Sequence, residues 1–275
     1  MGFRESKIVL NTKRMLNFLL GLVLKTRVNC HNRLAVLTYH NISMNESSDI
    51  YGICFRNFIS HLSFFKRNIE TLKTVHEFED FFNFRDNLKE HRVKMALSFD
   101  DGFKSILKIV PIIEKLDILT FLFITPAFVN RSEKYLTWDE LRFIKNALGD
   151  RVVVGSHGLT HSPLHLLNPD EVRKELVDSK AIIEDRLKLK VLFIAYPYGI
   201  DITDTMTEMA HEAGYVYGFT NRYGLNCPNG NKLKLKRIPV SRLDTSMTLK
   251  HKIYNEFNPH LLRYLFKEKR SICLK

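Results

Sequence analysis

Short apolar runs alternate with segments of helical spacing along most of the chain. The runs are rich in β-branched and aromatic residues and are bounded by turn residues, which is typical of buried strands. We expect strands at 34–38, 95–99, 118–125, 152–156, 191–195, 215–220 and 235–240. The intervening segments predict helices at 55–68, 103–116, 138–148, 169–187 and 204–213.

Several predicted helices carry recognisable end signals. Thr137 and Glu140 have the spacing of a capping box, in which each side chain binds the backbone N–H of the other residue. Asn168 followed by Pro169 provides an N-cap and a proline at the first helical position. Gly214 follows the helix at 204–213 and ends it. These signals support the helix boundaries that the apolar spacing predicts.

The order of strands and helices predicts the fold class. Strands that alternate with helices form a parallel sheet, because each helix carries the chain back to the start of the next strand. With seven or so such units in one chain, we expect a distorted (β/α) barrel and not an open sheet. We predict one barrel domain at 31–245, a basic and apolar extension at 1–30, and a helical extension at 246–275.

Residues that can bind metal follow two of the predicted strands. Asp100 and Asp101 end one apolar run, and His157 and His161 follow another. Two imidazoles and one carboxylate can fill three positions around a divalent ion and leave a fourth open to water. The second carboxylate is then available as a general base. The pattern therefore suggests metal-assisted hydrolysis.

Each half of this pattern also has a structural interpretation. Asp101 can cap the helix that follows it, and a partly buried histidine often only forms hydrogen bonds. The joint occurrence of the two halves after different strands of one α/β pattern favours a catalytic site.

A third segment, Phe193-Ile194-Ala195-Tyr196-Pro197-Tyr198-Gly199, again ends a strand with a sharp turn. With it the chain resembles the polysaccharide deacetylase family (carbohydrate esterase family four). That family has an Asp-Asp-Gly motif, a His-x-x-x-His motif and an Arg-x-Pro-Tyr-Gly-like motif in this order. The resemblance extends over about residues 34–244 and implies a deacetylase-type barrel.

The resemblance also implies residue roles. Asp101, His157 and His161 correspond to the ligands of a divalent metal, for which we expect Zn²⁺. Asp100 corresponds to the general base, and the backbone N–H of Tyr198 to the group that stabilises the oxyanion. The segment Tyr196, Pro197 and Tyr198 is expected to bind substrate.

The chain departs from the family pattern at three places. Ala195 stands where the family has the arginine that pairs with the base, and Arg237 or Arg242 are the possible replacements. Gly158 stands where the family has Ser or Thr after the first histidine, so a hydrogen bond that braces this loop is expected to be absent. The histidine of the family's late Leu-x-His motif is the usual general acid. Leu249-Lys250-His251 has the same residue types, but it lies in a segment that we expect to be a terminal helix. His40, at the end of the first strand, is the alternative acid, and a structural hydrogen bond is an equal interpretation of it.

Composition limits the possible partners. The chain has 275 residues, 45% of them hydrophobic, and a net charge of +12, which favours a globular protein that contacts anionic lipid or glycan. The basic residues are spread along the chain without a nucleic-acid-binding motif, so we expect no nucleic-acid partner. The four cysteines are isolated and predict free thiols. The apolar run at 15–24 is short for a membrane span and has no clear signal-peptide cleavage site, so it is a packed helix or an interfacial helix held at lipid by flanking cations.

The expected function is therefore metal-dependent removal of an N-acyl group, most simply acetyl, from an amino sugar of a polysaccharide or of a lipid- or nucleotide-linked glycan. The alternatives are a catalytically silent carbohydrate-binding barrel, a deformylase or other amide hydrolase of the same fold, and a basic membrane-surface protein. We expect a cytoplasmic protein, either free or peripheral at the inner membrane face, with secretion left open as an alternative. The oligomeric state is also left open.

Overall fold

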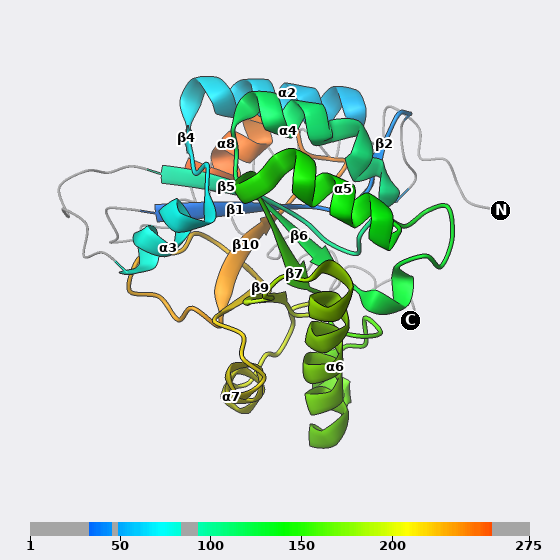
Figure 1. The fold of residues 1–275 in the computed structure, drawn as a ribbon. Coiled ribbons are helices and arrows are strands. Elements are labelled where there is room, and N and C mark those ends of the chain that lie inside the picture. The colour runs from blue at the N-terminus through cyan, green and yellow to red at the C-terminus, as the bar shows by residue number, and fades with distance from the viewer. Residues whose placement is uncertain (1–32, 46–48, 84–92, 255–275) are drawn as a thin grey trace, which may run out of the picture.

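Seven parallel strands close into a barrel in the computed structural model, which describes residues 33–45, 49–83 and 93–254 (Figure 1). Strand β1 pairs with β10 on one side and with β5 on the other, and this second pairing closes the ring in the order β1-β10-β9-β8-β7-β6-β5. The barrel strands are β1 (Arg33–Tyr39), β5 (Val93–Phe99), β6 (Thr120–Ile124), β7 (Val152–Ser156), β8 (Phe193–Ala195), β9 (Tyr217–Tyr223) and β10 (Leu235–Pro239). All seven predicted strands are present, and the predicted barrel is confirmed.

Three two-residue strands lie outside the ring and were not predicted. Strand β4 (Glu70–Thr71) pairs with the first half of β5, whose second half pairs with β6. Strands β2 (Ile42–Ser43) and β3 (Ile53–Cys54) form a separate sheet. Such short strands contain too few residues to show a period-two pattern, so the sequence gives no signal for them.

Helices surround the barrel (Figure 1). They are α2 (Phe55–Asn68), α3 (Val75–Asn83), α4 (Val110–Leu116), α5 (Trp138–Leu148), α6 (Pro169–Leu187), α7 (Asp204–Glu212) and α8 (Ser246–Tyr254). Single-turn or two-turn 3₁₀ segments are η1 (Lys104–Ile109), η2 (Pro126–Phe128), η3 (Gly149–Arg151) and η4 (Leu164–Leu166). The predicted capping boxes at Thr137 and Asn168 are both formed.

The single helix predicted at 103–116 is wrong in its first half. That half is the 3₁₀ segment η1, and α4 begins only at Val110 with a proline in its first turn. Pro111 has no N–H group and its ring excludes a preceding α-helical turn, so it fits only at the start of a helix.

The barrel has an aromatic interior that is separate from its outer core. Leu34 and Val36 of β1 belong to the inner cluster, whereas Ala35 and Leu37 belong to the outer one, as the alternation of a strand requires. Helix α3, which the sequence did not predict, closes the amino-terminal end of the barrel. The centre of its Phe78 ring lies 5.0 to 6.1 Å from the centres of four inner rings, those of Phe121, Phe193, Tyr217 and Phe219. The carboxyl end is therefore the end left for a site.

The predicted extensions are only partly visible. The extension at 1–30 lies outside the described residues, and so does the apolar run at 15–24. The one at 246–275 begins with α8, which packs on α2 through a 2.9 Å hydrogen bond between Ser60 Oγ and Ser246 Oγ. Among the described residues, no helix is both long enough and apolar enough to cross a bilayer.

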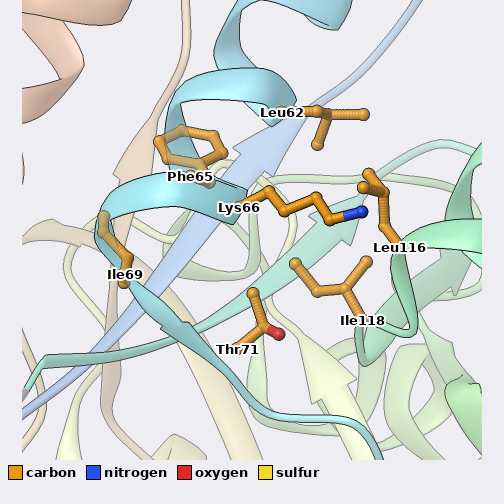
Figure 2. A pocket seen from close by; sticks show the side chains of 7 residues that line it. All are labelled: Leu62, Phe65, Lys66, Ile69, Thr71, Leu116 and Ile118. Carbon is orange, nitrogen blue, oxygen red and sulfur yellow. The ribbon is translucent and has the colours of Figure 1, made fainter.

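A small cavity lies between α2, β4 and the segment before β6 (Figure 2). Its volume is about 60 Å³, and the Lys66 side chain extends across it toward Leu116. It is lined by Leu62, Phe65, Lys66, Ile69, Thr71, Leu116 and Ile118, none of which is a candidate site residue.

Candidate active site

Polar side chains form a layer at the carboxyl ends of the barrel strands. Asp100 follows β5, and its N–H donates to Tyr39 O across the pair with β1 at 3.1 Å. His157 follows β7, and its N–H donates to Ile124 O of β6 at 2.8 Å. Both side chains are 2% exposed. The hydrogen bonding of the sheet thus continues one residue beyond each strand and fixes the backbone position of Asp100 and His157.

Asp101, His157 and His161 converge on one point. One ligand atom from each lies within 4.8 Å of the others. His161 Nε2 is 3.2 Å and His157 Nε2 is 3.6 Å from Asp101 Oδ1. His157 Nδ1 lies 2.7 Å from the carbonyl oxygen of Ala195, so it carries the proton and leaves Nε2 as a lone-pair donor.

These three residues fit a divalent metal. Asp101 Oδ1 is buried and has no hydrogen-bond partner within the described part of the chain. Burial raises the pKa of Asp101, but the imidazoles around it, His161 first, bring it down to about 2. Burial lowers the pKa of His157 despite the nearby carboxylates. An ionised carboxylate and a neutral imidazole are the forms that ligate metal.

The loops that carry the candidate site residues have unusual backbone conformations. Asp101, His161 and Tyr198 all have positive φ values, of 69°, 68° and 60°. This region costs a non-glycine residue about 1–3 kcal/mol and is occupied only where the surroundings enforce it. Asp101 does not cap the following helix, because the N-cap of η1 is Phe103, with no side-chain hydrogen bond. The structural alternative for Asp101 is therefore not what the molecule shows.

Asp100 is paired with Arg237, which lies in β10. Arg237 Nη1 donates to Asp100 Oδ1 at 2.8 Å, and the arginine is fully buried. Its Nε donates to Thr220 O at 3.1 Å, and its guanidinium lies 5.9 Å from the centre of the Phe123 ring. Of the two arginines that the sequence offered as partners, Arg237 is the one that reaches Asp100.

The charge of Arg237 sets the ionisation of Asp100. Burial alone raises the pKa of Asp100, but Arg237, followed by His157 and His40, leaves it below its usual value. Asp100 is thus held ionised in a nearly inaccessible place. An ionised buried carboxylate beside the candidate metal ligands is able to accept a proton.

The His-x-x-x-His loop is braced by a residue that the sequence did not indicate. Glu175 of α6 is 6% exposed, and its Oε2 accepts from Leu159 N at 2.7 Å and from Thr160 N at 3.0 Å. Its Oε1 accepts from the Thr160 hydroxyl. A Cβ on Gly158 would lie 3.0 Å from Oε2 and 2.8 Å from Pro197 Cγ. Glycine at this position, where φ is 72°, makes room for the Glu175 carboxylate and for Pro197.

We expect Glu175→Ala to lower the free energy of unfolding by about 1–3 kcal/mol, because it leaves the N–H groups of Leu159 and Thr160 without their acceptor. Glu175→Gln keeps the shape and an acceptor oxygen and should cost less. Thermal unfolding of the two variants measures the difference. Equal stability of Glu175→Ala and the native protein would show that the loop does not depend on this brace.

The Tyr196-Pro197-Tyr198 segment is divided between core and surface. Tyr196 is fully buried, and its hydroxyl donates to Leu233 O at 3.1 Å, so its side chain has no surface to offer a substrate. Pro197 is also buried. Tyr198 is 47% exposed, and its ring centre lies 4.9 Å from that of His161. Of these three side chains, only that of Tyr198 is exposed at the surface.

The two candidate acids have different positions. His251 lies on α8, which packs against α2 on the outside of the barrel. His40 follows β1 directly, and Tyr39 is in register with Phe99, so His40 and Asp100 are neighbours across the strand pair. Nδ1 of His40 is buried and makes no hydrogen bond to any described residue. His40 is therefore the candidate acid at the site.

Comparison with known proteins agrees with the resemblance that the motifs indicate. A family model described as polysaccharide deacetylase matches residues 87–218, a range that contains Asp100, Asp101, His157, His161 and Tyr198. By this match, which extends over just under half of its residues, the chain is similar to the polysaccharide deacetylase family. The Bacillus subtilis (strain 168) protein YxkH is 23% identical over 210 residues, which are 76% of this chain and 72% of YxkH.

Solved structures with the same fold include a deacetylase. The Streptococcus pyogenes deacetylase PplD, in complex with acetate, superposes with a TM-score of 0.69 at 22% identity and covers 80% of this chain and 98% of its own. IcaB from Ammonifex degensii has a TM-score of 0.65 at 25% identity, and the match covers 76% of this chain and 94% of the IcaB chain. These similarities agree with the predicted deacetylase-type barrel.

Proposed function

We propose that this protein is a metal-dependent hydrolase that removes the N-acetyl group from an amino sugar of a glycan. The observation that carries the proposal is the convergence of Asp101, His157 and His161 within 4.8 Å, next to the buried Asp100–Arg237 pair. A carbohydrate-binding protein without activity has no need for a buried ionised base at a metal site. The acetate complex of PplD, a protein of the same fold, supports acetyl as the acyl group.

The proposed metal ligands are Asp101 Oδ1, His157 Nε2 and the His161 imidazole. A metal bound there supplies a Lewis acid that polarises the acyl carbonyl and makes water a stronger nucleophile near neutral pH. Two imidazoles and one carboxylate are typical of catalytic zinc, so we propose Zn²⁺.

The side chains of this chain then perform the proton transfers. Asp100 accepts the proton of the attacking water, while Arg237 holds the carboxylate in place and ionised. The N–H of Tyr198 is proposed to donate to the oxyanion of the tetrahedral intermediate. His40 is proposed to protonate the departing amine, which cannot leave as an anion.

Replacing His40 with Gln is expected to slow amide hydrolysis by about 100-fold or more, because general acid catalysis is lost. Hydrolysis of 4-nitrophenyl acetate should change only a few-fold, since its phenolate leaves without protonation. Parallel assays of one N-acetylated oligosaccharide and this ester measure the ratio. An equal loss on both substrates would assign His40 a structural role.

The proposed activity is tested by acetate release from N-acetylated oligosaccharides. Acetate and a new free amine should appear in equal amounts. N-formyl and O-acetyl substrates of the same sugars separate a deformylase or an esterase from an N-deacetylase. Binding of the oligosaccharide without release of either product, in metal-loaded protein, would favour the silent binding barrel.

A further inference from the structure

We infer that Asn221 is a positioning residue that couples the base-holding Arg237 to the Tyr198–Gly199 turn. The inference rests on the proposed function, because that function gives the base and the turn their roles. Asn221 lies in β9, between β8 and β10 in the barrel, and is half-buried. Its position between these strands allows one side chain to reach both Arg237 of β10 and the turn that follows β8.

Asn221 bonds to both parts of the site. Its Oδ1 accepts from Arg237 Nη2 at 2.7 Å, and its Nδ2 donates to Tyr198 O at 2.7 Å. Its backbone N–H donates to Gly199 O at 3.1 Å. Asp100, Arg237, Asn221 and the turn therefore form one continuous chain of hydrogen bonds.

The orientation of the Asn221 amide is fixed by its partners. An arginine guanidinium only donates hydrogen bonds, so it must face the amide oxygen. A backbone carbonyl only accepts, so Tyr198 O must face the amide nitrogen. In a flipped amide, the Nδ2 donor would face the Arg237 donor, and the Oδ1 acceptor would face the Tyr198 carbonyl, so neither hydrogen bond could form. The side chain is thus matched to both neighbours at once.

The turn needs such a restraint. Tyr198 and Gly199 have φ values of 60° and 57°, and Tyr198 is not a glycine. The Tyr198 side chain is 47% exposed, so its own burial holds the turn only partly. The backbones approach so closely that a Cβ on Gly199 would lie 2.2 Å from Asn221 N. Asn221 is therefore in direct contact with both residues of the turn and holds both carbonyl groups.

The coupling has a catalytic consequence. The base, which follows β5, takes the proton of the water that attacks the acyl carbon, and the oxyanion donor, in the turn after β8, binds the oxygen on that same carbon. A misplacement of about 1 Å between such groups can cost 100-fold in rate. Asn221 connects the two through Arg237 and fixes their relative position.

The test compares Asn221→Ala and Asn221→Asp with a matched control, Asn226→Ala. Asn226 is another bridging asparagine and is buried: it donates to Leu34 O and Lys236 O and accepts from Lys236 N, and none of these hydrogen bonds reaches a candidate site residue. The measurements are kcat and KM for acetate release, thermal stability, metal content, and hydrogen–deuterium exchange of the segment at 196–200.

We expect Asn221→Ala to lower kcat by about 10- to 100-fold with KM within about threefold, and to speed exchange in the turn. Asn221→Asp keeps the acceptor for Arg237 but turns an oxygen toward Tyr198 O, so its kcat should be lowered as well. Asn226→Ala should lose thermal stability and keep both kcat and the exchange of the turn.

Two results would overturn the inference. One is a kcat of Asn221→Ala within twofold of native, or lowered only as much as in Asn226→Ala. The other is unchanged exchange at 196–200 in Asn221→Ala. The exchange measurement needs no activity, so it decides the coupling even if native protein releases no acetate, a result that would refute the proposed function separately.

Discussion

Asp100→Asn is expected to lower kcat for acetate release by about 10²- to 10⁴-fold, which is the range for loss of a general base. The amide is nearly isosteric with the carboxylate, and its oxygen can still accept from Arg237 Nη1, which is 2.8 Å from Oδ1 in the native protein. The fold and the three proposed ligands should therefore remain in place. Steady-state kinetics together with elemental analysis of the purified variant measure both effects.

The neighbouring substitution provides the contrast. Asp101→Asn removes a proposed ligand, so it should lose metal and activity together, whereas Asp100→Asn should lose activity alone. Loss of metal in Asp100→Asn would make Asp100 a ligand instead of the base. Retention of activity within tenfold would remove it from the proton transfer altogether.

Arg237→Met is expected to lower the free energy of unfolding by about 3–5 kcal/mol, because it leaves the Asp100 charge buried without its counter-ion. Asp100 is 2% exposed and Arg237 is fully buried, so water cannot replace the lost partner. Urea unfolding at neutral pH measures the change. The double variant Asp100→Asn/Arg237→Met removes both charges and should be more stable than Arg237→Met alone.

The same variant has a predicted pH dependence. Arg237 is the strongest of the groups that hold the pKa of Asp100 down, so its removal raises that pKa. A lowered carboxyl pKa in the folded state stabilises the protein above the unfolded pKa of about 3.9, and this stability is lost as the pH falls through the folded value. At neutral pH, native protein should therefore keep the stability that comes from the lowered pKa of Asp100, and Arg237→Met should lack this stability. Equal stability of the single and double variants across neutral and mildly acidic pH would contradict the role of the pair.

Local sequence signals predicted much of the barrel and the three proposed ligands. Seven apolar runs mark the seven strands because the strands of a closed parallel barrel are buried on both faces. Asp101, His157 and His161 each lie within a few residues of the carboxyl end of a strand, and the fold brings such ends together.

Features that depend on distant contacts could not be predicted in this way. Glu175 is one acidic residue among several in an amphipathic helix, and only the tertiary structure shows that it faces the His loop. Arg237 and Asp100 are 137 positions apart, so no local spacing distinguishes Arg237 from Arg242. For Asn221 a weak signal exists, since asparagine is unfavourable in a strand interior. Helix α3 closes the barrel through inward-facing phenylalanines, which in the sequence are only an aromatic cluster.

The most direct test of metal-dependent deacetylation measures bound metal and acetate release in the same samples of native protein and His157→Ala. We predict about one metal equivalent per chain in native protein, loss of acetate release after chelation, and its return when Zn²⁺ or a similar divalent ion is added. His157→Ala should bind less metal and release no acetate even after metal addition. Native protein that binds no metal when metal is supplied, or that releases acetate equally well after complete removal of metal, would contradict the account.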